Sequence, residues 1–233
     1  MSLLSTAIRE DLHQRFEELE GAVTLVLFEH RPEADEPAAR ACEFCPEAIA
    51  LAKELAELSE KIGVEVHDLA DKSDPAAAVY HVDRAPAWVL LGPGRVDFGI
   101  RFFGIPSGYE FSTIVADLIQ LSKGAPDLGA ETIRQLEGLD SEVMMRVFVT
   151  PTCPYCPQAV YLAHQMAMAS SMVSAEAFEA TEFHDLVQRY QVRGVPKTVL
   201  NDNLTVEGAV PEQRLLEMLT RASLEAGTVT IGA

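Results

Sequence analysis

The feature that most constrains the fold of this 233-residue chain is an internal repeat built around two C-x-x-C pairs. All four cysteines of the chain belong to these pairs, which are Cys42/Cys45 and Cys153/Cys156. Pro86 follows Cys42 by 44 positions, and Pro196 follows Cys153 by 43 positions. In both halves the proline begins an apolar strand-like run. So many shared landmarks indicate two copies of one supersecondary plan.

Hydrophobic periodicity predicts the same order of elements in each half. In the first half we expect helices at 5–20, 49–58, 75–81 and 111–121, and strands at 22–28, 64–69, 86–91 and 96–103. In the second half, after a short helix that ends at 139, we expect helices at 157–169, 182–191 and 211–224, and strands at 143–149, 172–179, 196–201 and 204–207.

Each half therefore follows the order β-α-β, then α, then β-β-α. A right-handed crossover joins parallel strands, and the final hairpin is antiparallel. We predict an α/β chain of two tandem units, each with a mixed sheet of about four or five strands and helices on both faces. The two sheets can also join edge to edge, which would cover two exposed edges.

Composition and the segment between the repeats indicate the general class of protein. Residues 123–129 have the composition of a linker and divide the chain into units 1–122 and 123–233. The hydrophobic fraction of 48% and the charged fraction of 23% are ordinary for a globular protein. The net charge of −18 argues against nucleic-acid and anionic membrane partners. Without a secretory signal pattern or a run of roughly eighteen apolar residues, we expect a cytoplasmic location.

The pair Cys153/Cys156 lies between a predicted strand and a predicted helix, a position that suits thiol–disulfide exchange. The free N–H groups and the dipole at the start of a helix favour a thiolate, which is the nucleophile. The spacing allows Cys156 to attack a mixed disulfide formed by Cys153. Two alternatives remain open, inert buried thiols and a zinc site of four cysteines. The zinc site would require two pairs that are 111 positions apart to meet.

These residues resemble the thioredoxin superfamily, and the tetrapeptide Cys153-Pro154-Tyr155-Cys156 is typical of glutaredoxins. Two such units in tandem, both with C-x-x-C, resemble the glutaredoxin-like protein disulfide oxidoreductases of archaea and thermophilic bacteria. The resemblance covers roughly residues 5–225. It implies reduction, oxidation or isomerisation of protein disulfides with no cofactor. Its implied partners are proteins with disulfides or thiols, and a thioredoxin-reductase-like flavoprotein that supplies electrons.

The same resemblance implies a role for each cysteine. Cys42 and Cys153 match the nucleophilic cysteines of the family, and Cys45 and Cys156 match the resolving ones. A second reading of the same residues is a dedicated electron-transfer module between a flavin reductase and a peroxidase. No metal site is expected, since the histidines show no ligand spacing.

Substrate contacts are also implied by the resemblance. Pro86 and Pro196 match the cis-prolines that pack opposite the disulfide. The backbone of Ala85 and Val195 would then face the sulfurs and pair with an extended substrate, as a short β-augmentation. Tyr155, inside the second motif, is expected to contact the substrate as well.

The two sites are predicted to be unequal. Glu43 lies between the first two cysteines, Glu47 lies two residues after them, and an acidic loop at 29–40 precedes them. Because nearby carboxylates raise the pKa of a thiol, we expect Cys153 to dominate. The strand at 143–149 lacks the buried aspartate of typical thioredoxins, so another group or water must handle the proton. Trp88 is interpreted as a core residue, and His164 as a buried or solvent-exposed residue and not as a catalytic base.

Overall fold

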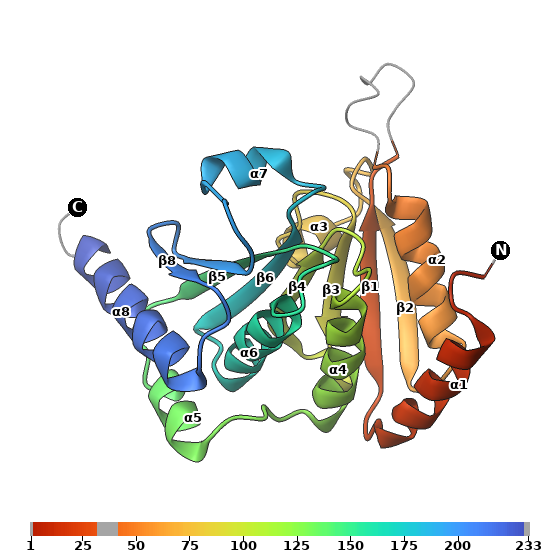
Figure 1. The fold of residues 1–233 in the computed structure, drawn as a ribbon, viewed down its shortest axis with the longest axis horizontal. Helices are drawn as coiled ribbons and strands as arrows, with labels where there is room; N and C mark the ends of the chain where they lie inside the picture. The colour runs from red at the N-terminus through yellow and green to blue at the C-terminus, as the bar shows by residue number, and fades with distance from the viewer. Residues whose placement is uncertain (1, 32–41, 231–233) are drawn as a thin grey trace.

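The computed structural model describes residues 2–31 and 42–230, with side chains described as far as residue 227 (Figure 1). The first half contains α1 (Thr6–Arg15), η1 (Phe16–Glu18), β1 (Val23–Glu29), α2 (Cys45–Ala56), β2 (Ile62–Asp68), α3 (Ala76–Val79), β3 (Ala87–Leu91), η3 (Pro93–Arg95), β4 (Asp97–Phe103) and α4 (Glu110–Lys123). The second half contains α5 (Ala130–Glu137), β5 (Val143–Val149), α6 (Cys156–Ala169), β6 (Val173–Glu179), α7 (His184–Arg189), β7 (Lys197–Leu200), β8 (Leu204–Glu207) and α8 (Glu212–Thr230).

The predicted order of elements is confirmed, and the boundaries differ by a few residues. The first helix ends at Arg15 and continues as one 3-10 turn, whereas α8 extends to Thr230, beyond the predicted end at 224. Most of the acidic loop at 29–40 lies outside the described residues. Within the part of the chain that the structure describes, no helix is long and apolar enough to cross a membrane.

The strands described here form one eight-stranded mixed sheet in the order β2-β1-β3-β4-β6-β5-β7-β8. In the first half β1 pairs parallel with β2 and antiparallel with β3, and β5 pairs in the same way with β6 and β7. The halves meet where β4 pairs parallel with β6, from Ile100↔Ala175 to Phe103↔Phe178. Each unit therefore contributes four strands, and the edge-to-edge junction covers two edges that would otherwise be exposed.

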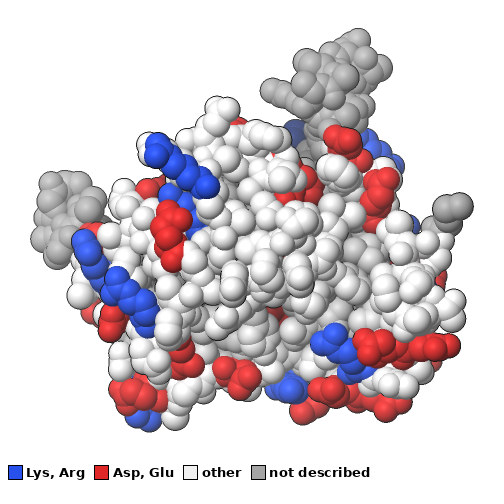
Figure 2. Space-filling model, viewed as in Figure 1, with Lys and Arg blue, Asp and Glu red and all other residues white. Residues whose placement is uncertain are grey.

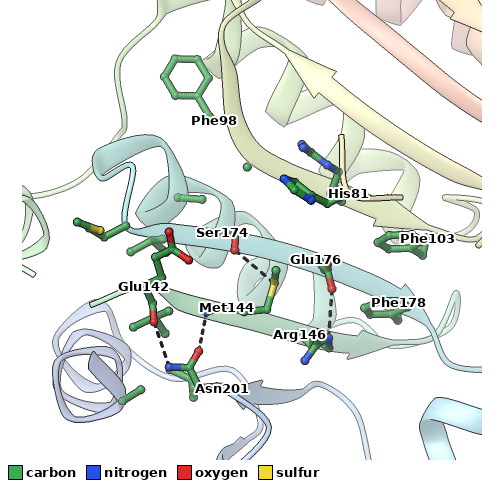
Figure 3. Close-up of a pocket in the computed structure, with 18 of the residues that line it drawn as sticks. His81, Phe98, Phe103, Glu142, Met144, Arg146, Ser174, Glu176, Phe178 and Asn201 are labelled. Carbon is green, nitrogen blue, oxygen red and sulfur yellow. Dashed lines mark hydrogen bonds and ion pairs between the residues drawn. The ribbon is translucent and has the colours of Figure 1, made fainter. Parts of the chain in front are cut away.

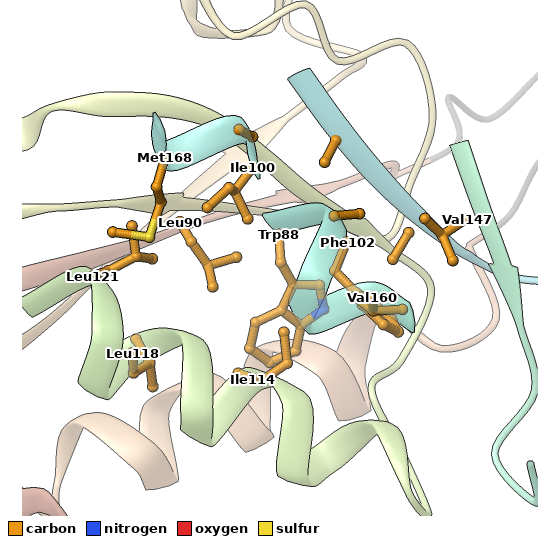
Figure 4. Packing of buried hydrophobic residues seen from close by; sticks show 14 of the residues in the cluster. Trp88, Leu90, Ile100, Phe102, Ile114, Leu118, Leu121, Val147, Val160 and Met168 are labelled. Carbon is orange, nitrogen blue, oxygen red and sulfur yellow. The ribbon is translucent and has the colours of Figure 1, made fainter. Parts of the chain in front are cut away.

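Alternate residues of the strands contribute to two apolar clusters on opposite faces of the sheet. Leu25 and Leu27 of β1 belong to a large cluster with α2, α4 and α6, whereas Val26 and Phe28 belong to a smaller one with α3 and α7. This alternation follows from the two-residue period of a strand. Trp88 is fully buried in the large cluster, as expected, and its Nε1 donates a hydrogen bond to the carbonyl oxygen of Gly104 at 3.0 Å (Figure 4).

The junction between the units is packed on both faces of the sheet. On one face the rings of Phe103 and Phe178 stack with centroids 4.5 Å apart and planes 4° from parallel. On the other face α4 of the first unit packs against α6 of the second (Figure 1). In Figure 2 the centre of this helical face is largely uncharged, and the charged side chains lie toward the rim. Both apolar clusters therefore contain residues of the two units.

The junction stack generates a stability prediction. Phe178 is only 2% exposed, so Phe178→Ala should lower the free energy of unfolding by about 3–5 kcal/mol through lost burial and a residual cavity. Phe44→Ala is the matched control, because Phe44 is 37% exposed and should cost less than about 1 kcal/mol. Urea denaturation of both variants measures the difference. Equal losses would show that the stack does not stabilise the junction.

Candidate functional site

The second cysteine pair lies between the end of β5 and the start of α6. The backbone N–H of Cys153 donates to the carbonyl of Thr150 at 3.1 Å, and Cys156 is the first residue of α6. Pro157 follows in the first helical turn, where a missing N–H costs little. The two cysteines form a disulfide, in which Cys156 is fully buried and Cys153 is 8% exposed. The first cysteine of the pair is therefore the more exposed one.

The first pair has the same arrangement. Cys45 is the first residue of α2, Pro46 follows it, and the pair forms a disulfide. Cys45 is 3% exposed, whereas Cys42 is half-buried. The zinc site considered above requires the two pairs to meet, but each pair is joined within itself. Among the described residues, no group of three or more histidines, cysteines and acids is arranged to hold a metal ion.

The two prolines occupy equivalent places beside the strands that lead into the motifs. The Ala85–Pro86 and Val195–Pro196 bonds are both cis, as the resemblance implied. Pro196 directly precedes β7, whose first residue, Lys197, pairs with Phe148 near the end of β5. The carbonyls of both prolines accept hydrogen bonds at 2.8 Å from glycines, Gly104 in the first unit and Gly208 in the second. Ala85 and Val195 are both half-buried.

Exposed aromatic side chains lie inside both motifs. Tyr155 is 67% exposed and precedes the second cysteine of its pair, and Phe44, which no sequence pattern singled out, occupies the equivalent position in the first pair. A third, Tyr109, is 52% exposed and belongs to the loop between β4 and α4. Its backbone N–H donates to the carbonyl of Pro151 at 2.9 Å, so a loop of the first unit contacts the segment that leads to Cys153.

This contact brings a buried acid of the first unit close to the second motif. Glu110, next to Tyr109, is 1% exposed, and one of its oxygens accepts a hydrogen bond from Thr113 Oγ1 at 3.0 Å. Its other oxygen has no partner among the described residues. Burial raises the pKa of Glu110 to about 7. No motif of the second unit indicates this residue, which is why the sequence did not predict it.

The same helix interface buries a second acid with a histidine. Nδ1 of His164 on α6 lies 2.7 Å from Oδ2 of Asp117 on α4, and both side chains are inaccessible to solvent. Burial raises the pKa of Asp117, against the opposing effect of His164. His164 is therefore buried, which is one of the two placements expected for it, and its partner comes from the other unit.

Acids of the second unit lie close to the first motif. Glu182, after β6, is half-buried, and its Oε1 accepts a hydrogen bond from the backbone N–H of Ile105 at 2.7 Å. Burial, together with the negative charges of Glu179 and Glu43, raises the pKa of Glu182 to about 7. The surroundings of the first pair are therefore more acidic than its own sequence indicates.

A large groove lies away from all four sulfurs. It is a groove of about 1750 Å³ on the α3 and α7 face, and no cysteine and neither cis-proline lines it (Figure 3). Two of its arginines form ion pairs, with Arg146 Nε 3.2 Å from Glu176 Oε2 and Arg101 Nη2 2.6 Å from Asp97 Oδ2. The groove therefore contributes nothing evident to thiol chemistry.

Comparison with known proteins agrees with this geometry. The family model for a thioredoxin domain matches residues 143–221. The AhpF component of alkyl hydroperoxide reductase from Xanthomonas campestris pv. phaseoli is 27% identical over 187 residues, which are 80% of this chain and 33% of that protein. The chain thus spans about a third of the length of the curated relatives that it matches.

Two solved structures match over nearly the whole chain. A protein disulfide oxidoreductase from Aeropyrum pernix is similar with a TM-score of 0.84 and 28% identity, covering 95% of this chain and 94% of that one. The N-terminal domain of the alkyl hydroperoxide reductase AhpF from Enterococcus faecalis has a TM-score of 0.81 and 25% identity, covering 93% and 99%. With two C-x-x-C disulfides at equivalent helix starts, the chain is similar to these two proteins over nearly its whole length and shares their tandem thioredoxin-like fold.

Proposed function

We propose that this chain is a thiol–disulfide oxidoreductase that acts on protein disulfides, with Cys153/Cys156 as the principal site. The observation that supports this function best is the pair of disulfides at helix N-termini, in each of which the first cysteine is more exposed than the second. This arrangement favours attack by the first sulfur on another molecule and resolution by the second.

In the reductive direction the thiolate of Cys153 attacks one sulfur of a client disulfide, and the other client sulfur leaves as a thiolate. The thiol of Cys156 then loses its proton, and its thiolate attacks the sulfur of Cys153. The second client thiolate leaves, and the Cys153–Cys156 disulfide remains. Two electrons have passed to the client, and an external dithiol must restore the reduced pair.

The proton of Cys156 requires an acceptor, and Glu110 is the candidate that the structure offers. Its carboxyl is buried at the α4–α6 interface, next to the loop that contacts the second motif. A group whose pKa lies near 7 can accept and return a proton at neutral pH. We assign Glu110 this role in place of the aspartate that the strand at 143–149 lacks.

The client is proposed to bind along the segments Ala85–Pro86 and Val195–Pro196. Main-chain groups there can pair with an extended peptide, a mode that recognises backbone and accepts many clients. Tyr155 provides an exposed aromatic surface beside the second disulfide. We also propose that the units divide at residues 1–122 and 123–233, so that each unit contains one pair and one such segment.

A second function is favoured by the AhpF relatives, which are named as components of alkyl hydroperoxide reductase. In this alternative the chain carries electrons from a flavoprotein to a peroxidase. A thioredoxin-reductase-like flavoprotein is the proposed electron source in both cases. Rates of insulin reduction and of peroxide reduction with a purified thiol peroxidase, driven by the same reductase, distinguish the two functions.

The inequality of the sites leads to the first prediction from the proposed function. Cys153→Ser should lower insulin reduction at least about tenfold, because the remaining pair lies among Glu43 and Glu182, which disfavour a thiolate. Cys42→Ser should retain more than about half of the wild-type rate. The turbidity assay with dithiothreitol measures both variants. An equal loss, or a larger one from Cys42→Ser, would refute the dominance of the second site.

The second prediction concerns the order of the two sulfurs. Cys156→Ser retains the nucleophile and lacks the resolving sulfur, so the mixed disulfide between Cys153 and an oxidised client should accumulate. A non-reducing gel shows this adduct, and a reductant releases it. Cys153→Ser serves as the control and should trap little. If Cys153→Ser traps the client instead, the two roles are reversed.

The third prediction uses the ionisation of Glu110. Because its folded pKa of about 7 exceeds the unfolded value of 4.5, the folded state binds more protons, and stability falls as pH rises between these values. Between pH 5 and pH 8 the wild type should lose unfolding free energy because Glu110 ionises. Glu110→Gln stays neutral, so its loss over the same pH range should be smaller by up to about 3 kcal/mol. Urea denaturation at both pH values measures this.

The same variant tests the proton-transfer role. Glu110→Gln should slow insulin reduction at least about tenfold, since general acid–base groups usually contribute more than this. The exposed Glu137→Gln is the control and should change neither quantity. If Glu110→Gln shows the stability effect but keeps the wild-type rate of insulin reduction, another group accepts the proton of Cys156.

A further inference from the structure

The loop that follows β4 connects the first redox site to the second unit. The backbone N–H of Gly104 donates to the carbonyl of Pro86, and the carbonyl of Gly104 accepts from Trp88 Nε1. The next N–H, that of Ile105, donates to Glu182 Oε1 at 2.7 Å. One continuous set of hydrogen bonds therefore joins Glu182 of the second unit to Pro86 of the first.

The approach of the two units at this point requires a glycine. Gly104 has a φ of +105°, and a Cβ atom built on it would lie 2.6 Å from Cβ of Glu179 and 2.7 Å from Oε1 of Glu182. Any side chain here would push the second unit away from the loop. The close contact between Glu182 and this loop therefore depends on the backbone at Gly104, which allows the two units to approach each other here.

The charges around Glu182 are mainly negative. Glu179 and Glu43 both act on it through their charges, and Glu43 lies between the two cysteines of the first motif. Asp185 follows in the first turn of α7. The nearby cation Arg84 pairs with Asp83 and Asp185, at 3.0 and 3.2 Å. Among the described contacts, no cation forms an ion pair with Glu182.

We propose that Glu182 is a positioning residue of the first redox site, which holds the Gly104–Ile105 loop against Pro86 and adds its charge to that of Glu43. The reactivity of Cys42 then depends on the ionisation of a carboxyl that belongs to the other unit. When Glu182 is ionised, the added negative charge disfavours the Cys42 thiolate, and when it is protonated this effect is absent. The pKa of about 7 puts this change in the neutral range.

This inference rests on the proposed thiol–disulfide function, but its test requires no turnover. The reduced full-length chain carrying Cys153→Ser and Cys156→Ser is treated with iodoacetamide, and mass spectrometry follows alkylation of Cys42 between pH 5.5 and pH 8.5. Cys45 is 3% exposed and should react slowly. If the wild-type protein did not reduce insulin, the proposed function would be refuted, but the alkylation of Cys42 could still be measured and interpreted.

Glu182→Gln keeps an acceptor for the Ile105 N–H and removes the charge. We expect Cys42 to react about threefold faster than in the parent at pH 8 and at the parent rate below about pH 6. For Glu182→Ala, the rate of Cys42 alkylation relative to the parent should depend on pH in the same way. Because this variant also loses the loop contact, its alkylation rate should in addition differ from that of the parent at all pH values. Asp185→Asn removes an equal charge three residues away, paired with Arg84, and should leave the profile unchanged.

Three results would overturn the proposal. An unchanged pH profile in Glu182→Gln, with a changed rate only in Glu182→Ala, would reduce Glu182 to a structural tether. If Glu182→Gln and Asp185→Asn changed the alkylation of Cys42 equally, the effect would come from the net charge of the region and not from the position of Glu182. A wild-type rate and profile in both Glu182 variants would show that this residue does not act on the first site.

Discussion

The parallel pairing of β4 with β6 is the interaction that holds the two units in one arrangement. It joins two four-stranded sheets and sets the register of one unit on the other, from Ile100↔Ala175 to Phe103↔Phe178. The other contacts between the units follow from this register, including the Phe103–Phe178 stack and the packing of α4 on α6. Because side chains alternate between the faces of a strand, a shift of this register would displace all of these contacts together.

A consequence of the junction is that each redox pair is surrounded partly by residues of the other unit. Glu110 of the first unit is buried beside the second motif, and Glu182 of the second unit is hydrogen-bonded to the loop beside Pro86. Both carboxyls owe their raised pKa chiefly to burial.

The predictions from sequence succeeded where the cause is local. Alternating apolar residues such as Leu25 and Val26 form the two faces of a strand, and prolines after Cys45 and Cys156 suit the first turn of a helix. The predictions were incomplete where the cause lies far along the chain. Burial of His164 was one of two expected outcomes, but its partner Asp117 lies 47 positions earlier on a helix of the other unit.

The two tandem α/β units and the two C-x-x-C pairs at helix starts could be predicted from the residues alone. Periodicity, turn residues and motif spacing act within a few residues or recur at a fixed interval, so a single chain displays them. The strand edges that join, and the acids that approach each disulfide, became known only from the folded chain. An apolar edge strand can pair with many partners, and a glutamate such as Glu110 ionises according to the residues that bury it. Neither property is encoded in the residues next to it.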